Sequence, residues 1–157
     1  MHRLIAPFAV ASVIFATIAV AATTPNEVKF SDTGAVAQSL TGKPGDAAMG
    51  FKIATTKSLG NCVACHVAQG WAKVPLPGNI GPDLTGVASR YSEAQIRGIV
   101  VNAKHTFPGS MMPSFYNVAN IIRPGDGYTA KPAKLPLKPI LSAQDVEDVV
   151  ALLETFK

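Results

Sequence analysis

Hydrophobic and polar positions along the chain predict three helices joined by long irregular stretches. In residues 46–58, apolar or small side chains recur three to four positions apart, as on one face of a helix. These positions are Ala48, Met49, Ile53 and Ala54. Asp46 follows a Pro-Gly pair and fits an N-cap, which favours a helix; a loop interrupted by Gly50 is the alternative.

Two later segments carry stronger helix signals, each with a capping pattern at its start. Residues 92–104 open on a serine with Gln95 three positions later, and residues 142–156 open on a serine with Asp145 three positions later. The apolar stripes are formed by Ile96, Ile99, Val100 and Ala103 in the first segment, and by Val146, Val149, Val150 and Leu153 in the second. We therefore predict an all-α fold.

The remaining stretches are irregular. Residues 71–91 and 118–141 hold most of the prolines, so neither is expected to form a long helix. A loop as long as 118–141 in a compact domain is usually functional or a binding element. Residues 105–117 are predicted to form a loop that carries two adjacent methionines.

The N-terminus has the pattern of an export signal. After Arg3, an uncharged stretch rich in alanine, valine and isoleucine ends in small residues that fit an A-x-A-like cleavage site. An uncleaved transmembrane anchor is the alternative, because the stretch is just long enough to span a bilayer. The predicted organisation is a cleaved signal peptide (1–22), an N-terminal arm (23–45) and one domain (46–157).

Composition changes this picture little. The 48% share of hydrophobic residues is inflated by the signal segment, and the formal charge of +4 loses one unit when Arg3 is removed. The chain has no run of like charge and no basic patch interleaved with aromatic residues, which argues against nucleic-acid binding.

The two cysteines of the chain carry its chemistry. Cys62 and Cys65 stand in a C-x-x-C-H pattern that ends at His66. Structural zinc would need two more ligands, and only His66 and His105 are at hand. A thioredoxin-like centre would follow a strand, which the flanking sequence lacks. In C-x-x-C-H both thiols add to the vinyl groups of a porphyrin and the histidine reaches the iron, so we predict one covalently bound haem c.

The sixth iron ligand is expected from the methionine loop. The candidates are Met111, Met112 and His105. Pro113 stiffens the backbone after Met112 and biases it to an extended conformation, and adjacent residues in an extended loop point opposite ways, so Met112 is preferred. The alternative is that the methionines fill the core.

The order helix, C-x-x-C-H, Pro/Gly loop, helix, methionine loop and amphipathic C-terminal helix resembles the class I cytochrome c fold. That resemblance implies that the carbonyl of Pro82, in "GPDLTG", accepts the ring N–H of His66; the alternative is an ordinary turn. Trp71, Tyr91, Phe107 and Tyr116 are either haem contacts or plain core residues.

Four stretches together, "GNCVACH", "PLPGNIGPDLTGVASRY", "MMPSFY" and "KPILSAQDVEDVVALL", resemble the SoxX family. Its members are the monohaem subunits of bacterial SoxAX complexes, which join thiosulfate to a carrier-protein cysteine. The resemblance implies a periplasmic heterodimer with a haem-bearing SoxA-type subunit, and transient contacts with the sulfur-carrier protein complex and an acceptor cytochrome.

An electron-transfer role follows from the resemblance, with no catalytic residue expected in this chain, because the haem consumes both thiols. A freestanding diffusible cytochrome c is the rival interpretation. A third is a peroxidase or gas sensor with an open iron position, which requires that neither methionine binds. We take the 118–141 loop, as a hypothesis, to belong to the partner-docking surface.

Overall fold

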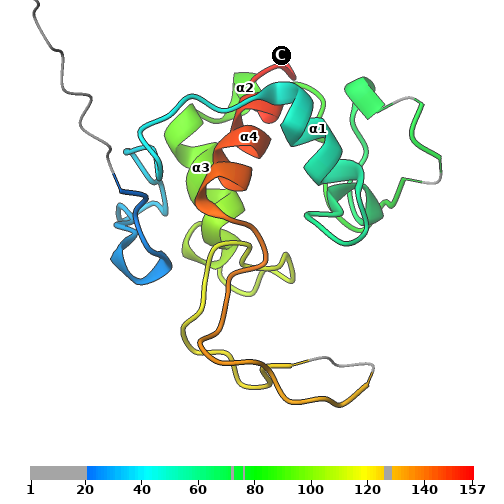
Figure 1. Ribbon diagram of the computed structural model, residues 1–157. Coiled ribbons are helices and arrows are strands. Elements are labelled where there is room, and N and C mark those ends of the chain that lie inside the picture. The colour runs from blue at the N-terminus through cyan, green and yellow to red at the C-terminus, as the bar shows by residue number, and fades with distance from the viewer. Residues whose placement is uncertain (1–20, 72, 76, 126–128) are drawn as a thin grey trace, which may run out of the picture.

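The computed structural model describes residues 21–71, 73–75, 77–125 and 129–157, and it is built from helices (Figure 1). Within these residues no strand forms beyond an isolated bridge between Gly125 and Pro132. The α-helices are α1 (Ala47–Thr55), α2 (Val87–Arg90), α3 (Glu93–Asn102) and α4 (Ala143–Leu153). The short 3-10 turns are η1 (Pro25–Glu27), η2 (Cys62–Ala64), η3 (Gln69–Trp71) and η4 (Ala103–His105).

The three predicted helices are confirmed, each with its cap. The side chain of Asp46 accepts hydrogen bonds at the start of α1, while Ser92 and Ser142 form capping boxes on α3 and α4. The loop alternative for the first helix is therefore wrong. In the described residues no helix has the length and apolar character needed to cross a membrane, and the predicted signal peptide lies almost wholly outside them.

The first and last long helices, α1 and α4, cross at close range (Figure 1). Gly50 lies at the contact, where a Cβ atom would come within 2.1 Å of the Asp148 carbonyl oxygen. The glycine that weakened the sequence signal for α1 is thus the residue that lets the two backbones approach.

The core lies between α3, α4 and the segments around them. Its fully buried side chains include Ile96, Val101, Val146, Val149 and Val150. Three charged side chains are buried with them, against the amphipathic expectation: Arg97, Glu147 and Asp148. Each has a defined partner, as a buried charge requires.

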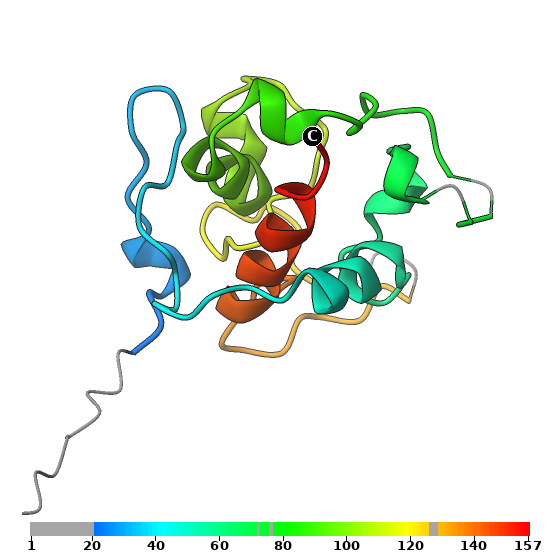
Figure 2. The same cartoon turned by 90° about the horizontal axis from the view of Figure 1, so that it is seen from above.

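The N-terminal arm explains one part of this burial. Glu147 Oε1 accepts the backbone N–H of Leu40 at 2.7 Å and Arg97 Nε at 3.0 Å, and Arg97 Nη1 donates to the Val36 carbonyl at 3.1 Å. Val36 and Leu40 are themselves buried. The arm therefore packs on the helices, and it lies on the side of α3 away from α1 and the cysteine turn (Figure 2).

Candidate functional site

The cysteines lie in a tight turn that is hydrogen-bonded to the end of α1. The backbone N–H groups of Gly60 and Asn61 both donate to the Ile53 carbonyl, at 3.1 and 3.3 Å. Cys65 and His66 then donate to the Cys62 carbonyl, at 3.1 and 3.0 Å. This winding brings both thiols and the imidazole onto one turn of chain, with η2 at its start.

The loop over residues 78–84 runs alongside this turn. Its backbone N–H groups donate in register: Gly78 to Val63 at 2.7 Å, Gly81 to Cys65 at 2.7 Å and Leu84 to Val67 at 2.9 Å. A Cβ atom on Gly78 would lie 1.9 Å from the Ala64 carbonyl oxygen, and one on Gly81 would lie 2.3 Å from the His66 ring. Glycine at both positions is what lets the loop lie flat on the turn.

The same loop orients the imidazole. His66 Nδ1 lies 2.8 Å from the Pro82 carbonyl oxygen. Because a carbonyl only accepts, the bond places the proton on Nδ1 and leaves the Nε2 lone pair free to bind a metal. The ring is thus held in the tautomer that an iron ligand needs.

Arg90 also holds the segment that follows Pro82, a role that the sequence analysis did not identify. Its guanidinium donates to the carbonyls of Thr85 at 2.6 Å and Asp83 at 2.9 Å. The Thr85 N–H donates to Asp83 Oδ1 at 2.7 Å, and this bond, with a smaller contribution from Arg90, lowers the pKa of Asp83. Only the spacing of Asp83, Thr85 and Arg90 across a turn hinted at the cluster.

The environment of Cys62 argues against a thiol–disulfide centre. Burial raises the pKa of its thiol to about 11, whereas a redox cysteine needs a lowered pKa to expose a thiolate. Among the described residues, no group of three or more histidine, cysteine, aspartate or glutamate side chains is placed to hold a metal ion. Zinc bound by the cysteines and His105 is therefore not supported either.

The two methionines of the 105–117 loop differ sharply. Met111 is 81% exposed, whereas Met112 is half-buried against the main core cluster, which Leu84 of the Pro82 loop also contacts. The Met112 carbonyl accepts a hydrogen bond from Lys104 Nζ at 2.7 Å. Of the pair, only Met112 combines a fixed backbone with a side chain that faces the protein.

The remaining candidate residues lie in different parts of the structure. His105 is exposed and stacks on Phe30 of the arm, with ring centroids 3.8 Å apart. Trp71 is buried in a core cluster beside Cys62, and Tyr116 is buried with its hydroxyl 2.7 Å from the Thr23 carbonyl oxygen. Tyr91 and Phe107 pack edge to face.

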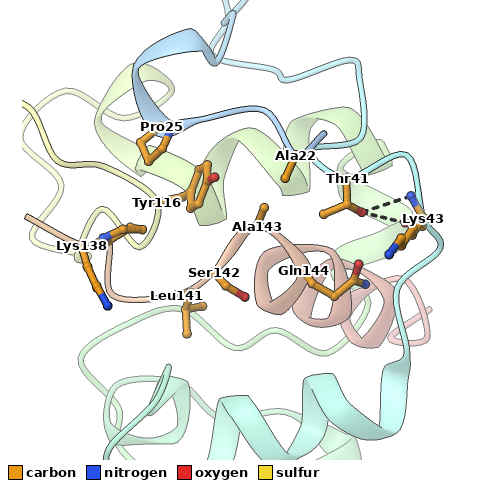
Figure 3. Close-up of a pocket in the computed structure, with 11 residues that line it drawn as sticks. Ala22, Pro25, Thr41, Lys43, Tyr116, Lys138, Leu141, Ser142, Ala143 and Gln144 are labelled. Carbon is orange, nitrogen blue, oxygen red and sulfur yellow. Dashed lines mark hydrogen bonds between the residues drawn. The ribbon is translucent and has the colours of Figure 1, made fainter. Parts of the chain in front are cut away.

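A hollow of about 600 Å³ lies elsewhere, between the arm and the start of α4 (Figure 3). Its lining includes Thr41, Lys43, Tyr116, Lys138 and Ser142. None of the predicted haem ligands borders it, so it takes no part in the site.

The residues around the turn fit a haem. Two thiols separated by two residues, a histidine with a free Nε2 and a half-buried thioether are the groups that a c-type haem uses. Ile80 precedes Gly81 in the loop over residues 78–84, and its apolar side chain is 66% exposed. In an all-helical fold, this set of features defines a class I c-type cytochrome with one haem attached through Cys62 and Cys65.

Comparison with known proteins agrees with that class. The chain belongs to the cytochrome c family, whose model matches residues 47–157. It is also similar to a chain of the crystal structure of SoxXA from P. pantotrophus, with a TM-score of 0.83 and 52% sequence identity over 87% of this chain and 99% of that one. No curated protein sequence matches it. The predicted fold and cofactor are confirmed.

Proposed function

We propose that this chain is the electron-transfer haem subunit of a periplasmic SoxAX-type complex. The observation that carries the proposal is the match to SoxXA, which extends over 99% of the matched chain at 52% identity. A likeness of that extent covers the loops as well as the haem motif, and the loops are what distinguish one class I cytochrome from another.

In this function the iron would be held by His66 and Met112. A bound haem c supplies a one-electron couple, and a thioether ligand raises its potential relative to a second imidazole. The chain's own residues set the geometry: Pro82 fixes the His66 ring, and the flat loop at Gly78 and Gly81 excludes side chains from the space beside it.

The reaction assigned to the complex joins thiosulfate to a cysteine thiolate on a carrier protein. A sulfur–sulfur bond forms between the two anions and two electrons are released. The partner subunit holds the reacting groups, and this chain takes the electrons one at a time and passes them to an acceptor cytochrome. It is catalytically silent alone, because its two thiols are bound to the haem.

The partner would dock, in part, on the loop over residues 118–141. The described parts of this loop, 118–125 and 129–141, extend away from the helices (Figure 1), with Ile122 94% and Leu135 81% exposed. The same stretch carries four exposed basic side chains: Arg123, Lys131, Lys134 and Lys138. Exposed apolar residues together with charge are typical of a protein interface, so we assign the acidic complement to the SoxA-type subunit. Export by residues 1–22 would bring the two subunits into the same compartment.

The test is reconstitution with the partner. The haem-loaded chain, co-expressed with a SoxA-type subunit, is expected to co-purify with it and to be reduced when thiosulfate and a carrier-protein thiol are added together. A double variant, Ile122→Ser with Leu135→Ser, should lose affinity for the partner and keep its haem spectrum, while Met49→Ser on α1 should change neither. A chain that binds no such partner, yet exchanges electrons rapidly with other cytochromes, would instead be a freestanding carrier.

A further inference from the structure

The loop that carries Met112 is pinned along the end of α3 and η4 by hydrogen bonds in a reversed register. The pairs are Tyr116 N to Val101 O at 3.2 Å, Ser114 Oγ to Asn102 Oδ1 at 2.8 Å, and Lys104 Nζ to Met112 O at 2.7 Å. The loop therefore runs antiparallel to the end of α3 and η4, and Met112 makes the last of these contacts.

The two ends of this pairing differ in strength. Val101 and Tyr116 are buried, so the inner end is fixed by the core. At the outer end Lys104 is exposed and Met111 is 81% exposed. The Met112 backbone is held there by two hydrogen bonds: its N–H donates to Ser110 Oγ at 3.3 Å, and its carbonyl accepts the charge-assisted bond from Lys104.

The backbone of Lys104 is held in place within η4. The Lys104 N–H donates to Asn102 Oδ1 at 3.3 Å, the same oxygen that accepts from Ser114. The next residue, His105, stacks on Phe30 of the arm with an angle of 13° between the rings. A shift of the Lys104 backbone would disturb both the hydrogen bond to Asn102 and the stacking of His105 on Phe30.

We propose that Lys104 is a positioning residue for the axial thioether and a local positive charge that raises the reduction potential of the haem. The inference rests on the proposed function, in which Met112 binds the iron. Holding the Met112 carbonyl fixes the backbone from which the sulfur reaches the metal, and an ammonium group near the ligand disfavours the more positive ferric state. Nothing in the sequence around Lys104 marks it for this role.

The test compares three haem-loaded variants. Lys104→Met removes the donor and its charge, Lys104→Arg keeps both, and Lys29→Met removes the same charge from an exposed site on the arm. Imidazole binds ferric haem by displacing the thioether, so its affinity measures how firmly the methionine is held. We expect Lys104→Met to bind imidazole about fivefold to tenfold more tightly than the wild type and to have a lower reduction potential. Lys104→Arg and Lys29→Met should remain close to the wild type in imidazole affinity.

The outcomes distinguish failure of the Lys104 role from failure of the proposed ligand set. If the wild-type ferric protein shows the long-wavelength absorption of an iron–thioether bond, but Lys104→Met behaves like Lys29→Met in imidazole affinity and potential, the positioning role is wrong and the ligand set stands. If the wild type lacks that absorption, Met112 does not bind the iron, and both the ligand set and the inference fall.

Discussion

Gly50 of α1 packs against the backbone carbonyl of Asp148 on α4, so closely that a Cβ atom at position 50 would lie 2.1 Å from that oxygen. The same Cβ would lie 2.9 Å from the Cβ of Leu152. Neither neighbour is a flexible chain end. The crossing of the first and last helices therefore depends on a residue without a side chain.

Gly50→Ala should force α1 away from α4. Because the clash is with backbone, we expect a loss of about 3 kcal/mol or more in the free energy of unfolding, measured by denaturant titration of the haem-loaded protein. Ala48→Val on the exposed face of the same helix is the matched control and should cost less than about 1 kcal/mol. Equal effects for the two variants would mean that the helices can separate at little cost.

Gly81→Ala should disturb the ligand geometry rather than the helices. The added methyl group would lie 2.3 Å from the His66 ring, so the ring or the Pro82 loop has to move. We expect less haem-loaded protein and an altered ferric spectrum. Gly109→Ala is the control for steric contact, because a Cβ there meets nothing within 4 Å and any cost of its left-handed backbone (φ +83°) falls in its own loop rather than at His66. A normal spectrum for Gly81→Ala would contradict the close approach.

Removing one partner of the buried ion pair between Arg97 and Glu147 should be strongly destabilising. The two side chains are 3% and 4% exposed, and Glu147 also accepts the Leu40 N–H of the arm. Glu147→Ala removes the buried partner of Arg97 and leaves its guanidinium paired only with the exposed Glu93 carboxylate, so the free energy of unfolding should fall by about 3 kcal/mol. Exchange of the Leu40 amide proton should also accelerate. Unchanged amide exchange would show that Glu147 does not hold the arm.

Met112→Ala should abolish the thioether absorption of the ferric protein and open the iron to carbon monoxide in the ferrous state. Met111→Ala, at the 81% exposed neighbouring position, should leave both properties intact. Optical titration with carbon monoxide is the measurement. The reverse pattern would make Met111 the ligand.

The loop that orients His66 should respond to acid through Asp83. The Thr85 N–H lowers the pKa of this carboxyl, so its stabilisation is present above the ordinary carboxyl range and is lost as the pH falls through the lowered value. Between about pH 6 and about pH 3, the melting temperature of the wild type should fall further than that of Asp83→Asn. Parallel curves for the two proteins would remove Asp83 from the acid response.

Local signals made most of this fold predictable. The serine caps and apolar stripes of α3 and α4 act within one helix, and the C-x-x-C-H motif acts within one turn, so the sequence displays them directly. The buried charges were not predictable, because Arg97, Glu147 and Asp148 find their partners only when distant segments meet. A charged residue on a helix is ordinarily a sign of a solvated face.

The residues of the candidate site were likewise predictable only in part. The preference for Met112 over Met111 came from local backbone reasoning, and the two side chains do differ in exposure. Arg90 and Lys104 act on loops through backbone carbonyls, an interaction that leaves no residue pattern behind. Pro82 was singled out only through the resemblance to class I cytochromes c.

The burial of Cys62 has a consequence for the order of assembly. The thiol packs in a cluster that includes Leu152 and Phe156, residues synthesised long after the cysteine turn. In the folded chain, burial raises the pKa of the free Cys62 thiol to about 11 and makes the nucleophilic thiolate scarce. We therefore expect haem to attach more readily before α4 packs on the cysteine turn than after it.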